Sequence, residues 1–567
     1  MQYGIHRCDE ALRTLQYPLS DSSGFLREGL YDTLKTAVAR NTFALQLAVY
    51  LTLSAALSPV NAQPPAILQE GVRNEASRMP PSLPGGALSP GSRIVISGLR
   101  FPQVPYLSVR AGAKEWIVTA IEASHTQGVW QLPGDLAPGT ASLILSNEDG
   151  ESRPYPISIT SQSGGIYSLN GQGWGPAHAS RTQPGGGRKL IDQRQPAHAG
   201  EEIVLVATGS AKDFLLSVGG LAARARWVPS AAGRAELLVR VPPGAPFGCH
   251  VPVQLSYRGG LVGNSVTIPI APPGFPCEPE KMWPTPNVSE KAPIGLLLMA
   301  RFKLRIELSG QSGVDFTDEE AALQFLSPSA DPTQPPPVEI LPPAGTCVTF
   351  HGLYHQEFGL RQNLLEMIRE RLPGPATRAG SEIFVEGPEG RRKIPRDAQG
   401  GGYFAFLGGE RPDYIRAALP LFLVPGAYRV QASGGEDAGP FSVDFRMPPE
   451  FRSKSLIQQD SVTRRQGLRL AWTGGAQDLP IYVLAVSVRH STTAFGACLC
   501  AVPVGQKKFT IPPEALANLP ATEPESTMPM NLVFLISTPA PALFQSRGVS
   551  AGYVLPVTVL GRTMVFR

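Results

Sequence analysis

The chain has 567 residues, which is too many for one hydrophobic core and predicts roughly three to five domains of about 100 to 200 residues each. It contains 59 Gly and 57 Pro but only 17% charged residues, a balance that favours short strands and turns over long helices. The formal net charge of +4 is small, and no run of Lys and Arg alternates with aromatic residues, so we do not expect nucleic acid as a partner.

Residues 1–62 are interpreted as an N-terminal extension followed by a secretory signal peptide. Lys35 and Arg40 precede an uncharged apolar run over residues 42–57, which ends in the small residues Val60-Asn61-Ala62. This order is typical of a signal peptide and makes Gln63 the expected first residue of the mature protein. An uncleaved membrane anchor is the alternative, although the run is a little short for a spanning helix. A start codon placed too far upstream would explain residues 1–31.

Residues 63–82 are polar and end in prolines, and we interpret them as a linker. Residues 83–160 follow as a first module of short runs rich in β-branched and aromatic residues, separated by turn signals at regular spacing. This pattern predicts a Greek-key sandwich with an immunoglobulin-like (Ig-like) fold. The strands are expected at residues 93–97, 107–109, 115–118, 129–132, 141–146 and 155–159.

Residues 161–272 repeat this plan at an offset of 109 residues without a gap. The two modules share identical residues at turn glycines and apolar strand positions, which indicates that one fold is used twice. The matching pairs are Gly91/Gly200, Ile94/Ile203, Val95/Val204, Ser108/Ser217, Val109/Val218, Ala113/Ala222, Pro133/Pro242, Gly139/Gly248, Gly150/Gly259 and Ile159/Ile268.

A family resemblance covers these two modules, about residues 83–272. In the second module it rests on Gly165-Ile166-Tyr167, residues 171–177, residues 196–209, Val218-Gly219-Gly220 and Val241-Pro242. These look like the Solibacter uncharacterised C-terminal domain of secreted acidobacterial proteins, although Tyr167 stands where phenylalanine is usual and almost 300 residues follow. Residues 88–92 and 136–139 resemble the Ig-like IPT/TIG module that often precedes that domain. The resemblance implies a fold and a bacterial, exported location, but it implies no catalytic residues.

The remaining chain is interpreted as a proline-rich linker at 273–290 and two further modules. Residues 291–448 form a β-rich module with two short helices: Thr317 and Glu320 have capping-box spacing for a helix over 317–323, and a helical apolar period covers 356–372. Residues 449–567 form a C-terminal β-sandwich, with a strand and turn at 467–475 and a helical turn at 513–519. The predicted fold class is mainly β, as tandem Ig-like β-sandwich modules with a few short helices in the third module.

Five cysteines remain after the signal region, and an exported chain meets oxidising conditions. Cys277 and Cys347 flank the first part of the third module and are the favoured disulfide pair. Cys249 aligns with Thr140 in the repeat, so the sandwich does not require a cysteine there. Cys498 and Cys500 are expected on one face of a strand, one buried and the other bonded or free.

A long glycine-rich excursion over residues 163–199 separates the first two modules. Long loops of this kind are either functional or mobile. Trp174, between Gly173 and Gly175, is the candidate ligand-contacting aromatic, and these three residues are the proposed ligand-binding site. Trp472 is expected in a core.

Two clusters in the third module are candidates for catalytic or metal sites. His351 and His355, with Glu357 nearby, lack the glutamate that a zinc protease needs directly after the first histidine, and exposed loop histidines are the simpler interpretation. Asp315, Asp318, Glu319 and Glu320 lack the register of a calcium loop and fit a helix N-terminus. No catalytic residue, metal site or cofactor is therefore expected.

The sequence predicts an exported, non-catalytic β-sandwich protein with a binding, adhesion or structural role at the cell surface or outside the cell. Extracellular polysaccharide or another surface protein is the expected partner, and no membrane span is expected after signal removal. The alternatives are an accessory carbohydrate-binding protein, a hydrolase with a site in residues 315–357, and a periplasmic structural protein.

Overall fold

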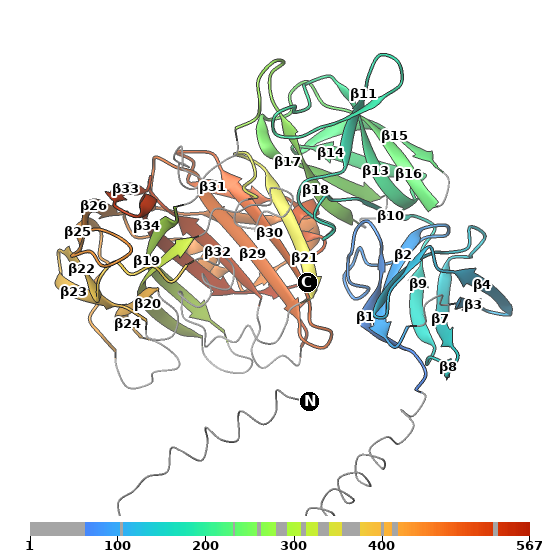
Figure 1. The fold of residues 1–567 in the computed structure, drawn as a ribbon, viewed down its shortest axis with the longest axis horizontal. Coiled ribbons are helices and arrows are strands. Elements are labelled where there is room, and N and C mark those ends of the chain that lie inside the picture. Colours follow the sequence, from blue (N-terminus) through green and yellow to red (C-terminus); the bar gives the residue numbers. More distant parts are fainter. Residues whose placement is uncertain are drawn as a thin grey trace, which may run out of the picture. The chain divides into compact units, whose positions relative to one another are not determined.

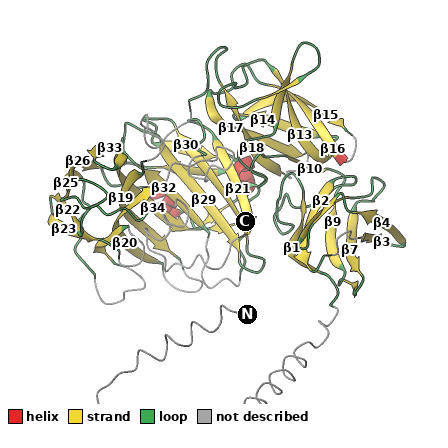
Figure 2. Cartoon of the chain, in the orientation of Figure 1, coloured by secondary structure: helices red, strands yellow, loops and turns green. Residues whose placement is uncertain are grey.

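The computed structural model describes residues 63–101, 106–230, 233–257, 262–278, 292–307, 313–326, 340–353, 375–397, 402–410, 418–524 and 531–567. All elements discussed here belong to the compact unit Pro64–Arg567. Strands make up almost all of its regular structure, which confirms the mainly β fold class and the Ig-like sandwich modules (Figures 1 and 2). The predicted signal peptide and the helix expected over 356–372 lie outside the described residues. No described helix is long and apolar enough to cross a membrane.

The first sandwich packs two sheets of short antiparallel strands. One sheet has the order β1-β2-β6-β5 and the other β4-β3-β7-β8, with β9 on β7. Ile94, Leu107, Trp130 and Leu143 are fully buried between them, because alternate side chains of each strand face inward. The strands are β1 (Ala66–Asn74), β2 (Arg93–Leu99), β3 (Tyr106–Ala111), β4 (Lys114–Thr119), β5 (Glu122–Ala123), β6 (Gln127–Gln131), β7 (Gly139–Asn147), β8 (Gly150–Glu151) and β9 (Tyr155–Ile159).

The linker expected over residues 63–82 is in part a strand of this sandwich. β1 pairs antiparallel with β2 from Ala66 opposite Leu99 to Asn74 opposite Ile94. Val72 is fully buried and belongs to the core of the first sandwich. The first sandwich therefore begins before Leu83. The polar composition misled the prediction because an edge strand has one solvated face and few apolar residues.

The second sandwich forms one continuous nine-stranded sheet that folds over its own core. Its order is β12-β11-β13-β16-β15-β14-β17-β18, with β10 on β13. Leu205, Leu237, Val253 and Ile268 are fully buried in that core. The strands are β10 (Ser163–Ile166), β11 (Ala179–Thr182), β12 (Arg188–Leu190), β13 (Glu202–Ser210), β14 (Phe214–Val218), β15 (Leu221–Pro229), β16 (Arg234–Arg240), β17 (Gly248–Tyr257) and β18 (Val262–Ile270).

The strands of the two sandwiches correspond at the offset of 109 residues. Arg93, the first residue of β2, maps to Glu202, the first residue of β13, and β7 and β17 begin at the matching glycines Gly139 and Gly248. Gly91 and Gly200 both occupy the left-handed region, with φ of 71° and 77°, as a turn before the strand requires. The repeat in the sequence therefore reflects a repeated set of strands.

Strand β15 changes partner along its length. Its first residues pair with β14, up to Leu216 opposite Ala223, and from Arg224 onward it pairs with β16 instead. The start of β14, before Leu216, and the second half of β15 therefore separate from each other, and an opening forms between the two layers of the second sandwich. This opening holds the candidate site described below.

The rest of the chain shares a second nine-stranded sheet, here called the C-terminal sheet, with the order β21-β30-β29-β32-β34-β19-β20-β24 and β33 on β34. Its strands are β19 (Ile294–Ile306), β20 (Val314–Leu326), β21 (Cys347–Leu353), β24 (Tyr403–Gly409), β29 (Ile481–Arg489), β30 (Ala494–Val502), β32 (Leu532–Ser537), β33 (Ala542–Ser546) and β34 (Val549–Thr563).

This sheet joins the two modules that were predicted to divide at residues 448 and 449. β19 pairs in parallel with β34 from Ile294 opposite Ala551 to Arg305 opposite Arg562. Strands from both predicted modules therefore belong to one hydrogen-bonded sheet, with β30, β29, β32 and β34 of the second lying between β21 and β19 of the first. The division was wrong because two parallel strands can be far apart in the sequence, where local patterns give no sign of the pairing.

Two separate layers cover this sheet. A four-stranded sheet, β23-β22-β25-β26, buries Phe325, Tyr403 and Phe422 in one core. The two-stranded antiparallel sheet of β28 and β31, with short helices, buries Trp472, Val483 and Leu535 in another core, which confirms Trp472 as a core residue. These elements are β22 (Glu382–Gly387), β23 (Gly390–Pro395), β25 (Gly426–Ala432), β26 (Phe441–Met447), α4 (Lys454–Gln458), β27 (Ser461–Val462), η3 (Arg464–Gln466), β28 (Leu468–Ala471), β31 (Lys508–Ile511), α5 (Pro513–Leu516) and β35 (Val565–Phe566).

The short helix expected over residues 317–323 is a strand. Those residues lie within β20, which pairs with β19 on one side and β24 on the other. The capping-box spacing of Thr317 and Glu320 is a local signal, and two ladders of hydrogen bonds outweigh it. The α-helices among the described residues, α4 and α5, lie in the C-terminal region and not in the third module, and α5 confirms the helical turn predicted from Pro513.

Candidate functional site

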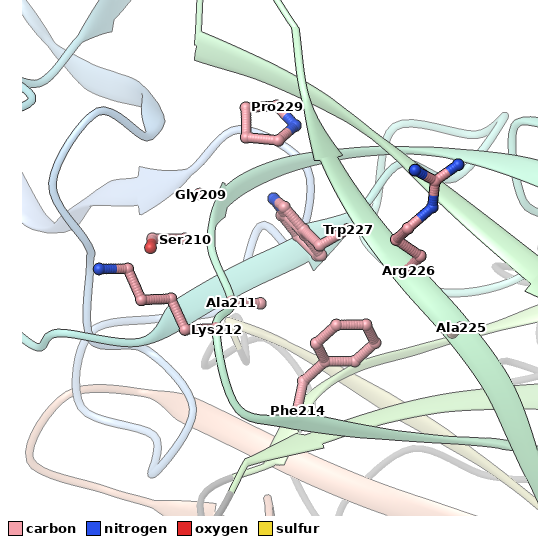
Figure 3. A pocket seen from close by; sticks show the side chains of 9 residues that line it. All are labelled: Gly209, Ser210, Ala211, Lys212, Phe214, Ala225, Arg226, Trp227 and Pro229. Carbon is pink, nitrogen blue, oxygen red and sulfur yellow. The ribbon is translucent and has the colours of Figure 1, made fainter.

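The second sandwich contains a cleft of about 480 Å³ where β15 separates from β14. This volume is within the usual range of small-ligand sites, about 300 to 1,000 Å³. Its lining comes from the end of β13, the β13–β14 loop, the first residue of β14 and the second half of β15 (Figure 3). The lining residues are Gly209, Ser210, Ala211, Lys212, Phe214, Ala225, Arg226, Trp227 and Pro229.

The rings of Phe214 and Trp227 form the apolar part of this cleft. Their centroids lie 6.0 Å apart, edge to face at 67°. Both rings are only partly buried and pack against the core of the second sandwich. Ala225 lies two positions before Trp227 on the same face of β15 and also lines the cleft. The pair therefore combines a rigid position with an accessible aromatic surface.

Polar groups surround the rings. Lys212 is exposed on the β13–β14 loop, close to Ser210 in the lining. Arg226 is exposed and points to the opposite side of β15 from its neighbour Trp227 (Figure 3). A ligand in the cleft can contact an aromatic face, a hydroxyl group and a cation together. This combination of an apolar surface with a few polar groups is typical of binding sites.

Sequence reasoning favoured Trp174 over Trp227, which is also a tryptophan able to stack on a sugar ring if exposed, although the repeat contained a signal for Trp227. The counterpart of Trp227 in the first sandwich is Val118, and the counterparts of Phe214 and Lys212 are Pro105 and Gln103. A framework position needs the same type of residue in both copies, and these three positions differ. The aromatic and cationic residues are therefore specific to the second copy.

Trp174, the aromatic residue of the predicted site, is partly buried and makes a packing contact. Its ring meets Phe350 of β21 edge to face, with centroids 5.3 Å apart, in a cluster with Ile340 and Val348. Gly173 and Gly175 have φ of 80° and 83°. A Cβ at Gly173 would lie 1.7 Å from the Ser77 carbonyl oxygen, so this close approach requires glycine.

His351 is buried on β21, so its interpretation as an exposed loop histidine was wrong. Its Nε2–H donates to the Ser77 carbonyl oxygen at 2.6 Å. Burial lowers the pKa of His351 to about 4, so the ring is neutral at pH 7. His355 and Glu357 lie outside the described residues. No group of three or more His, Cys, Asp or Glu is placed to hold a metal ion within the described part of the chain.

The acidic residues on and beside β20 make structural ion pairs. Glu319 is fully buried, accepts from the backbone N–H groups of Phe422 and Leu423, and lies 3.3 Å from Arg301. Asp315 pairs with Arg305 on β19 at 2.9 Å. These contacts replace the helix N-terminus that the sequence predicted for the acidic cluster.

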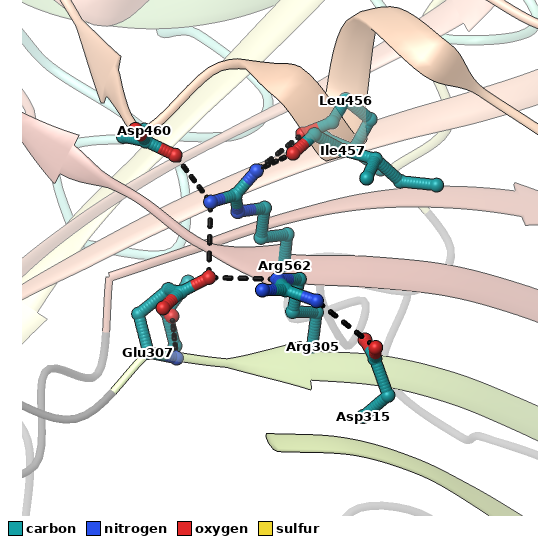
Figure 4. Close-up of polar contacts among 8 residues, drawn as sticks. Arg305, Glu307, Asp315, Leu456, Ile457, Asp460 and Arg562 are labelled. Carbon is teal, nitrogen blue, oxygen red and sulfur yellow. Dashed lines mark hydrogen bonds and ion pairs between the residues drawn. The ribbon is translucent and has the colours of Figure 1, made fainter. Parts of the chain in front are cut away.

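Arg305 belongs to a wider network centred on the buried Arg562 (Figure 4). Glu307 lies 2.7 Å from Arg305 and 3.0 Å from Arg562. Arg562 also pairs with Asp460 and donates to the backbone carbonyl oxygens of Leu456 and Ile457. The network attaches α4 to the C-terminal sheet.

The disulfide predicted between Cys277 and Cys347 was wrong. Cys249 pairs with Cys277, with Cα atoms 5.3 Å apart, and Cys347 pairs with Cys500. The prediction treated Cys249 as dispensable because Thr140 replaces it in the first copy, but the segment after β18 returns beside the start of β17. Cys498 is buried and free while Cys500 is bonded, as their shared strand face predicted.

No protein-family model and no curated protein matches the chain. Similar solved structures include the tandem Ig repeats of Dlar, at 10% identity over 37% of this chain and 98% of that chain, with a TM-score of 0.14. Another is a Bacteroides ovatus surface glycan-binding protein, SGBP-B, in complex with a mixed-linkage heptasaccharide, at 11% identity over 58% and 69%, with a TM-score of 0.20. A third is a Ca²⁺-stabilised adhesin of an Antarctic bacterium, at 9% identity over 87% and 99%, with a TM-score of 0.13. We draw no functional conclusion from these similarities.

Proposed function

We propose that this protein is an exported, non-catalytic carbohydrate-binding protein, located at the cell surface or outside the cell, with its ligand site in the second sandwich. The observation that carries the proposal is the cleft formed by Phe214 and Trp227. Partly exposed aromatic rings offer a flat apolar face on which a sugar ring can stack, while nearby polar groups bond its hydroxyl groups.

Two further observations support this location and role. Cys249–Cys277 and Cys347–Cys500 are disulfides, which form and persist in oxidising compartments outside the cytoplasm. The apolar run after Lys35 and Arg40 has the pattern of an export signal. The β-sandwiches provide a rigid scaffold. Proteins with such a scaffold usually carry their binding residues on loops and at strand ends.

Glycan-array binding of the full-length protein tests the proposal. We expect capture of at least one class of polysaccharide and a loss of about fivefold in affinity for Trp227→Val, because a stacked ring contributes on the order of 1 kcal/mol. Valine is the residue that the first sandwich has at this position. Cell fractionation should find the protein outside the cytoplasm.

Trp116→Val is a matched control, because Trp116 is a partly buried tryptophan on β4 of the first sandwich and does not line the cleft. It should keep the binding of the parent. If the protein binds another surface protein and no glycan on the array, its ligand is a protein and the carbohydrate proposal is wrong. Retention in the cytoplasm would contradict export.

A further inference from the structure

The outer face of β15 and β16 carries exposed arginines beside the cleft. Arg224 on β15 lies directly opposite Arg240 on β16, and both side chains are exposed. Arg226 follows two positions after Arg224 on the same face of β15. The face therefore presents three guanidinium groups next to the strand segment that holds Trp227.

This arrangement is unfavourable for the isolated protein. Like charges directly opposite each other on neighbouring antiparallel strands repel, and sheets usually place opposite charges there. Other arginines of the second sandwich have partners: Arg188 pairs with Glu236 at 2.9 Å and Arg181 with Glu201 at 3.1 Å. Within the described residues, no ion pair involves Arg224, Arg226 or Arg240.

The acidic residues nearby do not balance this face. Glu202 on β13 lies opposite Arg240, which in turn lies opposite Arg224. One carboxylate therefore faces two guanidinium groups across these three strands, and a net positive charge remains. In the next row Arg226 lies opposite Leu238, which has no charge. Asp213 directly follows Lys212 in the chain and is the acidic residue nearest to it in the sequence.

The fold does not require these arginines. In the first sandwich the corresponding residues are Glu115 for Arg224, Ile117 for Arg226 and Gln131 for Arg240. Glu115 there accepts hydrogen bonds from Ser108 and Arg110. The same strands are thus stable with an acidic, an apolar and a neutral residue, so the positive charge is a property of the second sandwich alone.

We propose that the second sandwich binds an acidic polysaccharide that passes around the edge of β15 where this strand leaves β14. One sugar ring lies in the cleft against Trp227 and Phe214, near Lys212, and carboxylate or sulfate groups of neighbouring sugars lie on Arg224, Arg226 and Arg240 of the outer face. Guanidinium groups form paired, charge-assisted hydrogen bonds with such anions, and an anion near Arg224 and Arg240 offsets their mutual repulsion. This inference rests on the proposed carbohydrate-binding function and assigns its ligand class.

The test measures binding of the full-length protein to immobilised polygalacturonate, dextran sulfate, uncharged dextran and duplex DNA at rising NaCl concentration. Binding to polygalacturonate or dextran sulfate, weakened by salt, is expected, with little binding to dextran or DNA. The two acidic polymers separate a preference for carboxylate from one for sulfate. Arg224→Gln with Arg226→Gln should weaken the affinity about tenfold and flatten its salt dependence.

Two further variants make the result specific. Arg469→Gln with Lys508→Gln removes two exposed charges from β28 and β31, in the C-terminal region, and should leave the affinity unchanged. Trp227→Phe keeps an aromatic ring and should retain most of the affinity that Trp227→Val loses. Thermal unfolding of each variant distinguishes a lost contact from a lost fold.

The outcomes separate this inference from the function on which it rests. Binding only to neutral glycans, lost in Trp227→Val but unaffected by the arginine changes, would overturn the acidic ligand and leave carbohydrate binding in place. Equal binding to DNA would show a general polyanion surface and also overturn it. No binding to any glycan would contradict both proposals.

Discussion

Cys347 and Cys500 face each other across β21 and β30 and are joined by a disulfide, with their Cα atoms 4.0 Å apart. The bridge links positions 153 residues apart in the sequence. It also fastens β21, which has one neighbouring strand in the sheet order, to the rest of the C-terminal sheet. A cross-link over so long a loop strongly restricts the unfolded chain.

Replacing both cysteines of this bridge by alanine should lower the free energy of unfolding by about 2 to 5 kcal/mol. The matched variant Cys249→Ala with Cys277→Ala opens a loop of only 28 residues and should cost about 1.5 kcal/mol less. Denaturant unfolding of both variants against the parent measures the difference. Equal stability of the parent before and after reduction would contradict the prediction.

The Cys498 thiol should be unreactive in the folded protein. Burial raises the pKa of this thiol to about 12, so almost no thiolate exists at pH 8, and reagents cannot reach the sulfur. We expect iodoacetamide to label Cys498 only after denaturation, as shown by peptide mass mapping without reduction. Rapid labelling of the native protein at pH 8 would contradict the buried position.

Stability should fall as the pH drops from about 6.5 toward about 4. Burial lowers the pKa values of His351 and His250 to about 4, so in this range the unfolded chain binds protons that the folded chain does not. Each histidine contributes on the order of 3 kcal/mol over the window, at about 1.4 kcal/mol per pH unit.

The variant His351→Gln keeps an N–H donor for the Ser77 carbonyl oxygen and removes one of these two titrations. Its unfolding temperature should therefore depend less steeply on pH between 6.5 and 4.5 than that of the parent. Thermal scans across this range provide the measurement. Parallel pH profiles for variant and parent would show that His351 does not contribute.

Trp174→Ala should reduce stability without reducing ligand binding. The Trp174 ring packs against Phe350, and its removal leaves space in an apolar cluster, at a cost of about 2 to 3 kcal/mol for a partly buried ring. Trp227→Val should show the reverse, with a small stability change and a large loss of affinity. Thermal unfolding and glycan binding measured on both variants distinguish the two tryptophans.

Sequence patterns were reliable where local chemistry determines the structure. Paired residues of the repeat, such as Val109 and Val218, are fully buried on corresponding strands, because alternation of apolar residues specifies which face of a strand is inward. Gly91 and Gly200 adopt the positive φ that their turns predicted. The sandwich class and the strand positions of the repeated segments therefore followed from the sequence, whereas β1 and β20 did not.

Contacts between segments that are far apart in the sequence did not follow from sequence patterns. The Trp174 loop suggested an exposed aromatic because glycines flank it, but its environment depends on Phe350, which is far away in the sequence. The cysteine partners depended on which strands become neighbours, and Cys347 reaches Cys500 only because β21 pairs with β30. The cleft around Trp227 depends on the point at which β15 leaves β14, which no local pattern marks.

The parallel pairing of β19 with β34 also sets an order of folding. Residues 294–305 of β19 have no partner on that side until residues 551–562 have been synthesised. The two N-terminal sandwiches contain their own paired strands and cores, and can fold while the ribosome is still extending the chain. β19 and β20 carry the buried Leu297 and Phe325, and their sheet is completed on the β34 side only at the end of synthesis, so we expect the exposed edge of β19 to favour aggregation of the nascent chain until then.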